Sequence, residues 1–109
     1  MKLFTKKIEE KAQAQYSLGS DLEKQMVVAK FFNPTGAGSW YLMNQSSEDP
    51  DYCWGICHIF EWEIGSFSKS ELDNYKGKFG LGIERDLNFE EVNAKELWDK
   101  INKKITQSF

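Results

Sequence analysis

The fold is decided by residues 52–67, which read YCWGICHIFEWEIGSF and alternate between two kinds of side chain. The even positions hold large residues, whereas the odd positions are mostly small or acidic. Alternation with a period of two is typical of a β-strand, and sixteen residues exceed the usual length of one strand. We therefore predict two strands that join near Ile59 and Phe60.

Further strands are predicted on both sides of this stretch. Residues 25–32 are β-branched and aromatic, and turn-forming residues beginning at Asn33 end them. Residues 39–43 predict a second strand around Trp40 and Tyr41, and residues 83–87 predict a short extended piece. Consecutive strands with short connections favour an antiparallel sheet.

Three helices are indicated by their capping residues. Thr5 is a helix cap for a segment that ends near Ser17, and Ser68 with Glu71 forms a capping box for a short helix. A second box begins at Asn93, before a helix whose apolar stripe is Leu97, Trp98, Ile101 and Ile105. We predict one α+β domain over residues 1–109. Its antiparallel sheet has about four to five strands, and its N-terminal, short middle and C-terminal helices pack mainly on one face.

Composition and charge indicate an ordinary globular protein with a polarised surface. The chain has 109 residues, of which 40% are hydrophobic and 28% charged. We expect no signal peptide, because no apolar stretch follows the first basic residues, and no run approaches the ~18 apolar residues that a membrane span needs. With two cysteines predicted to be reduced, the expected location is the cytoplasm. Residues 45–75 carry seven carboxylates and one lysine, a net charge of -6, while both chain ends are basic. This pattern indicates either solvated faces or a surface that orients a partner.

The two cysteines and the only histidine do not predict a metal site. In a strand, Cys53 and Cys57 share a face about 13 Å apart, and His58 points the other way. Zinc needs its sulfur ligands at ~2.3 Å. We expect packed side chains at these positions, and we predict no metal and no cofactor.

Two acidic pairs are better candidates for a site. Glu61 and Glu63 share one strand face, and Glu84 and Asp86 repeat the arrangement around Arg85. Four carboxylates side by side would bind a divalent cation or raise the pKa of one carboxyl group enough for proton transfer. The alternative is an exposed sheet face on which the acids pair with lysines or with Arg85.

Nucleic-acid binding would rest on the lysines of the terminal helices, which include Lys100, Lys103 and Lys104. The aromatic residues lie elsewhere, in the acidic sheet. Such binding is predicted to be weak and to depend strongly on salt.

Several motifs together resemble one protein family. The chain opens with Lys-Leu-Phe-Thr-Lys, continues with Glu-Trp-Glu-Ile-Gly-Ser-Phe-Ser at 61–68, and later reads Gly-Leu-Gly-Ile-Glu-Arg-Asp at 80–86. This pattern resembles the bacterial family catalogued as domain of unknown function 2958. The Cys-rich strand and the longer C-terminal helix depart from the family's pattern.

The resemblance implies no established activity. It does imply that the protein is encoded as cargo of plasmids, conjugative elements or phages. It also implies a polar cluster, either functional or bonded within the molecule, of Glu61, Glu63, Glu84, Arg85 and Asp86. We expect a non-catalytic accessory protein that contacts another protein through its acidic middle. The alternatives are a metal-assisted hydrolase or nuclease that uses the carboxylates, and a nucleic-acid-binding module that uses the terminal lysines.

Overall fold

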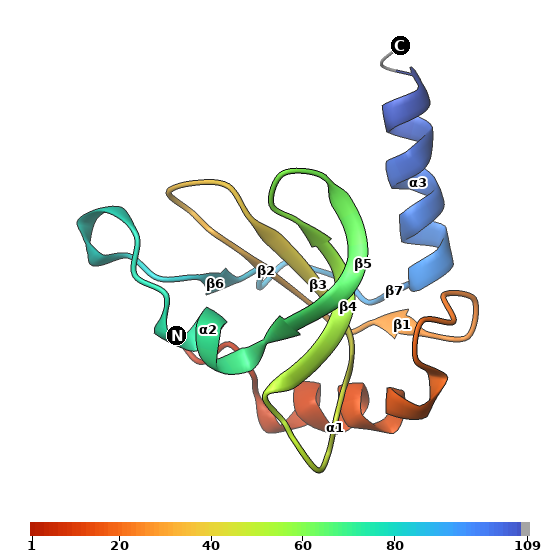
Figure 1. Ribbon diagram of the computed structural model, residues 1–109, viewed down its shortest axis with the longest axis horizontal. Helices are drawn as coiled ribbons and strands as arrows, with labels where there is room; N and C mark the ends of the chain where they lie inside the picture. Colours follow the sequence, from red (N-terminus) through yellow and green to blue (C-terminus); the bar gives the residue numbers. More distant parts are fainter. Residues whose placement is uncertain (108–109) are drawn as a thin grey trace.

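The computed structural model describes the backbone of residues 1–107 and the side chains of residues 1–104, so the side chain of Ile105 lies outside the described part. Figure 1 shows the arrangement of the elements along the chain. Their bounds are α1 Lys6–Ala14, η1 Tyr16–Leu18, β1 Met26–Val27, β2 Ala29–Phe32, β3 Ser39–Gln45, β4 Tyr52–His58, β5 Trp62–Ser68, α2 Lys69–Asn74, η2 Lys78–Gly80, β6 Glu84–Arg85, β7 Val92–Asn93 and α3 Ala94–Gln107.

The main sheet has five strands in the order β5-β4-β3-β2-β6, and every neighbouring pair is antiparallel. The predicted pair of strands is confirmed, because β4 ends at His58 and β5 begins at Trp62. The predicted strand over residues 25–32 is divided in two. Its first part, β1, pairs with β7 in a separate two-stranded sheet, while β2 pairs with β3.

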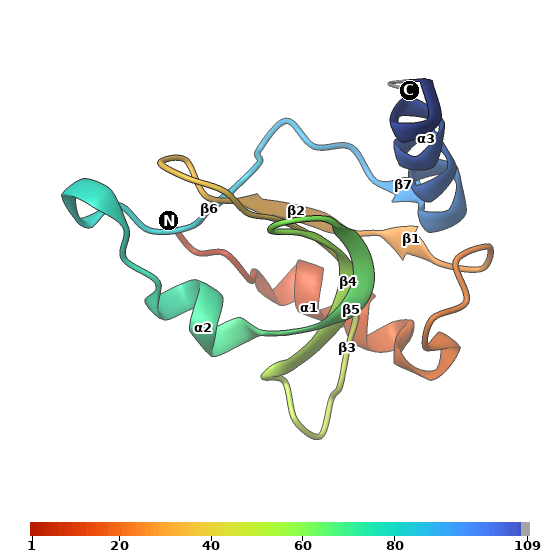
Figure 2. The same ribbon diagram turned by 45° about the horizontal axis from the view of Figure 1, so that its top comes forward.

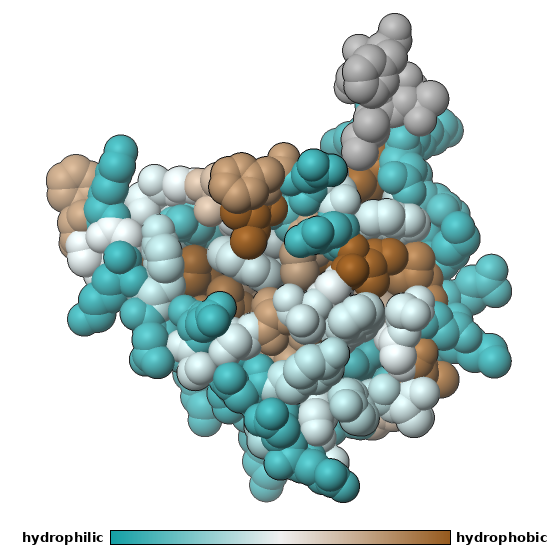
Figure 3. Space-filling view, in the orientation of Figure 1, coloured by the Kyte–Doolittle hydropathy of each residue, from teal (hydrophilic) through white to brown (hydrophobic). Residues whose placement is uncertain are grey.

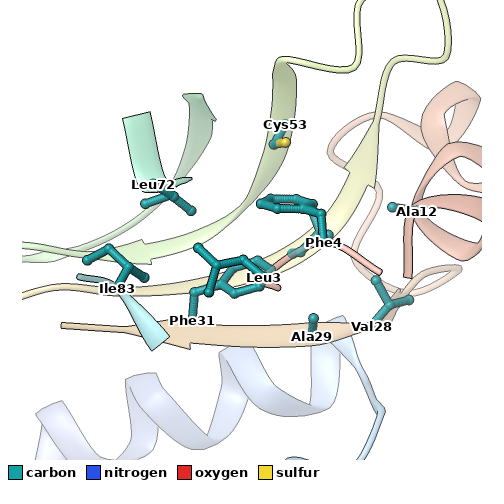
Figure 4. Close-up of a cluster of buried hydrophobic side chains, with 10 residues drawn as sticks. Leu3, Phe4, Ala12, Val28, Ala29, Phe31, Cys53, Leu72 and Ile83 are labelled. Carbon is teal, nitrogen blue, oxygen red and sulfur yellow. The ribbon is translucent and has the colours of Figure 1, made fainter. Parts of the chain in front are cut away.

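One face of the sheet packs against the N-terminal segment, α1 and α2. Its core includes Phe4 and Phe31, whose ring centroids lie 4.8 Å apart. Ala12 of α1 and Leu72 of α2 close over the same cluster, as Figure 4 shows. These side chains are buried, so this face supplies much of the hydrophobic stabilisation of the domain.

The opposite face packs against the start of α3. Met43 and Ile56 are buried there with Ala94 and Ile101. Figure 2 shows α1 and α2 on one side of the sheet and α3 on the other. The predicted α+β domain with an antiparallel sheet and three helices is therefore confirmed, with two of the three helices on one face.

The predicted helix caps are present. The Thr5 hydroxyl accepts a hydrogen bond from the Ile8 amide at 3.2 Å, and Ser68 accepts one from Glu71 at 3.3 Å. The Asn93 side chain likewise accepts from the Glu96 amide at 3.1 Å. Each cap satisfies a backbone N–H that the helix itself leaves without a partner.

Buried amide side chains fix the segment between η1 and β1. Asn44 donates to the Gly19 carbonyl at 2.9 Å and to the Gln25 side chain at 2.8 Å. Gln25 in turn donates to the carbonyls of Gly19 and Asp21. Because buried polar groups need partners, this network holds the irregular segment against β3. Within residues 1–107, no helix is long and apolar enough to cross a membrane.

Candidate protein-binding site

The two predicted acidic pairs lie at opposite edges of the sheet. Glu61 is in the turn before β5 and Glu63 is in β5, whereas Glu84 is in β6. Strands β4, β3 and β2 lie between these edges, so the sheet order does not bring the four predicted carboxylates together. In the described part of the chain, no three His, Cys, Asp or Glu residues are grouped so that they would hold a metal ion.

Arg85 and Asp86 have structural contacts. The Arg85 guanidinium donates to the backbone carbonyls of Lys2 and of Leu3, the latter at 3.1 Å, and so anchors the N-terminal segment beside β6. Asp86 accepts from the Asn88 amide at 2.9 Å and lies 3.9 Å from the Lys30 ammonium. The partners of Arg85 are thus main-chain carbonyls and not the carboxylates that the sequence suggested.

The cysteines and His58 are packed, as expected. Cys53 and Cys57 are free, buried thiols. Burial raises the pKa of each to about 12, and nearby carboxylates add to the effect. The His58 ring stacks on Trp62 with centroids 4.2 Å apart and planes 5° from parallel. The two stacked residues are register partners across the β4–β5 hairpin.

A hollow of about 340 Å³ opens beside β5, between the β2–β3 turn, the β4–β5 hairpin and α2. Its apolar floor includes Trp40, Cys57 and Phe67 of the sheet, and its polar wall includes Glu63 of β5 and Glu71 of α2. Asn33 and Tyr75 also line the hollow. An apolar floor with a few polar groups is typical of a binding site.

A second hollow of about 310 Å³ continues along the same strand. It shares Ser66, Phe67, Ser68 and Glu71 with the first hollow and adds Asp49 and Asp51. We call the two hollows together the β5 groove. The groove therefore runs along β5 with carboxylates at both of its ends.

The β3–β4 loop and the start of α2 place the carboxylates of the second hollow. Asp51 accepts hydrogen bonds from the Ser70 amide at 2.7 Å and from the Ser68 hydroxyl at 2.8 Å, which orients α2 beside β5. The Ser70 amide bond, followed by the serine hydroxyls, lowers the pKa of Asp51. Asp51 therefore stays ionised at neutral pH while it fixes the start of α2, the helix that carries Glu71.

The groove keeps unneutralised negative charge. Within the described residues, neither Glu63 nor Glu71 forms an ion pair, and the nearby Lys69 ammonium pairs instead with Glu9 at 3.0 Å. Burying these carboxylates without a nearby cation would cost free energy.

Exposed apolar side chains flank the groove. Phe60 at the tip of the β4–β5 hairpin is 94% exposed, and its neighbour Ile59, which lines the groove, is 45% exposed. Phe79, in the loop before β6, is also 94% exposed and has a φ of 60°, an uncommon conformation for a residue other than glycine. Figure 3 shows apolar surface at the hairpin tip and at the end of this loop.

Sequence reasoning singled out Glu63 as a site candidate but not the other members of the groove. Glu71 was assigned to a helix cap and counted within the acidic middle, and Tyr75 received no role. The short helix folds back over the sheet and brings both toward Glu63. The excess of carboxylates over residues 45–75 was the available signal, because it marks the segment that forms most of the groove.

Together, the fold and the groove define a small α+β domain with an acidic groove along one edge of its sheet. A family model described as "Protein of unknown function (DUF2958)" matches residues 3–106. The chain therefore belongs to this family, as its motifs had indicated. Neither the curated proteins nor the solved structures gave a significant match.

Proposed function

We propose that this chain is a non-catalytic accessory protein of a bacterial mobile genetic element and that it binds a partner protein in the cytoplasm through the β5 groove. The observation that carries the proposal is the groove itself. It combines an apolar floor, exposed apolar side chains at Ile59 and Phe60, and Glu63 and Glu71, which form no ion pair within the described part of the chain. Protein interfaces commonly combine apolar contact area with charged groups that give specificity.

The geometry favours binding over the metal-assisted alternative. That alternative needs Glu61, Glu63, Glu84 and Asp86 around one cation, and the sheet order puts them at two edges. Glu84 lines a different hollow, of about 430 Å³, together with Asp73 and the first residues of the chain. A carboxylate site for one cation therefore has no support from the predicted residues.

The nucleic-acid alternative also gains no support from the arrangement of the lysines. Those of α1 and α3 lie on helices that pack against opposite faces of the sheet, as Figure 2 shows. Several are already in ion pairs: Lys11 with Glu91, Lys95 with Asp99, and Lys100 with Glu96. The lysines of the two helices are therefore divided between the two sides of the sheet, which favours protein binding over one continuous basic surface.

Capture of partners from a host that carries the parent element tests the proposal. A groove variant, Glu63→Gln with Glu71→Gln, is expected to recover the partner protein about tenfold less than the wild type, because the positive groups of the partner lose their counter-charges. The matched control is Glu10→Gln with Glu90→Gln, which removes the same charge outside the groove. Equal recovery by both variants would show that the groove is not the contact surface.

A further inference from the structure

β5 is an unpaired edge of the main sheet. The strand covers seven residues, Trp62–Ser68, and within residues 1–107 it pairs in the sheet with β4 alone. Among the described residues, no backbone hydrogen bond joins residues 62–67 to a segment on the outer side. The alternate N–H and C=O groups that point away from β4 are therefore available to another strand.

The groove lies along this same edge, and the two faces of β5 carry different kinds of side chain. Glu63 projects on the face of Cys57, toward the acidic hollow, because these two residues are register partners. Trp62 and Ile64 project on the opposite face, where they are half-buried beside Ile56. An added strand would thus meet carboxylates on one face and apolar side chains on the other.

We propose that the partner contributes an extended segment, with basic residues alternating with apolar ones, that pairs with β5 as a sixth strand of the sheet. The inference rests on the proposed function and specifies its binding mode. In such strand addition the backbone bonds supply affinity, and the alternate side chains supply specificity. Basic side chains enter the groove toward Glu63 and Glu71, and apolar ones cover Trp62 and Ile64.

Charge argues for this partner over a second copy of the chain. Two copies paired through β5 would bring two acidic grooves together, each without a cation partner for Glu63 or Glu71. Like charges that face each other across an interface are destabilising. A segment with alternating positive charge would instead neutralise the groove while its backbone completes the edge.

The test uses the full isotope-labelled chain and a heptapeptide of alternating lysine and valine as the probe. The matched control is the same peptide with every peptide nitrogen methylated, which keeps the charge and removes the backbone donors. We expect the methylated peptide to bind about tenfold more weakly. We also expect the unmodified peptide alone to slow hydrogen exchange at alternate amides of β5.

The outcomes separate the binding mode from the proposed function. If the two peptides bind equally and both lose binding to the Glu63→Gln, Glu71→Gln variant, strand addition is wrong and the groove remains a protein-binding site. If neither peptide perturbs β5, strand addition is also wrong, and the capture experiment alone decides the role of the groove. Protection of β5 that rises with protein concentration in the absence of peptide would identify a second copy as the occupant.

Discussion

Replacing Gly55 with alanine is expected to destabilise the domain by about 3 kcal/mol or more, near the upper end of the cost of overpacking a core. Gly55 lies in the middle of β4, between β3 and β5. A Cβ atom at this position would lie 1.9 Å from the Tyr41 carbonyl oxygen and 3.2 Å from the Met43 amide nitrogen. Both are backbone atoms of β3, so the strands themselves would have to separate.

The register shift in β3 accompanies this close approach. Leu42 pairs with Gly55, and Asn44 pairs with Trp54, so Met43 is the extra residue of a bulge. Bulges bend and twist the strand that contains them, and a glycine on the partner strand permits the close contact. We therefore expect Gly55 to be necessary for the curvature of the sheet.

The matched control is Gly65→Ala on the adjacent strand. Gly65 is the register partner of Gly55, but a Cβ added there would meet no atom within 4 Å. Its stability change is expected within about 0.5 kcal/mol, as for most surface substitutions. Urea unfolding followed by tryptophan fluorescence measures both variants. Equal stabilities would show that the strands do not approach each other as described.

The second large effect is expected on the rate at which a thiol reagent modifies Cys53 and Cys57, which should be much lower in the native protein than in the unfolded chain. The pKa of Cys53 and of Cys57 is raised to about 12 by burial, from 9.0 for an ordinary thiol. At pH 8 the native protein would then hold about a thousandfold less thiolate than the unfolded chain, and the thiolate is the reactive form. We expect an aromatic disulfide reagent to modify the native thiols about a thousandfold more slowly than those of the urea-unfolded protein.

The same shift has a defined consequence for stability at alkaline pH. Above pH 9 the unfolded thiols lose their protons, whereas the native thiols keep them until about pH 12. The native state then binds more protons, so the free energy of unfolding falls as the pH rises through this interval. Cys53→Ala and Cys57→Ala would each reduce the pH dependence. Reaction of both native thiols at the rate of the unfolded chain would contradict the burial.

Local patterns predicted much of the fold. The alternation over residues 52–67 gave the correct break between β4 and β5, and Thr5, Ser68 and Asn93 cap helices as expected. These features depend on residues close together in the chain, which short-range periodicity and capping chemistry describe well.

The order of the strands depends on contacts that a single sequence does not show. No local signal places β6 beside β2, and this pairing carries Glu84 away from Glu63. Arg85 bonds to the carbonyls of Lys2 and Leu3, at the other end of the chain. Long-range topology therefore separates the members of the predicted polar cluster, and of these five residues Glu63 is the one that lines the groove.

The central claim is that a partner protein occupies the groove along β5. Its most direct test is site-specific photocross-linking in a host that carries the parent element. A photoreactive residue replaces either Tyr75, which is 42% exposed and lines the groove, or Leu87, which is 69% exposed and lies outside the groove. We predict one discrete cross-linked protein from position 75 and none from position 87. A partner cross-linked from position 87 and not from position 75 would contradict the claim.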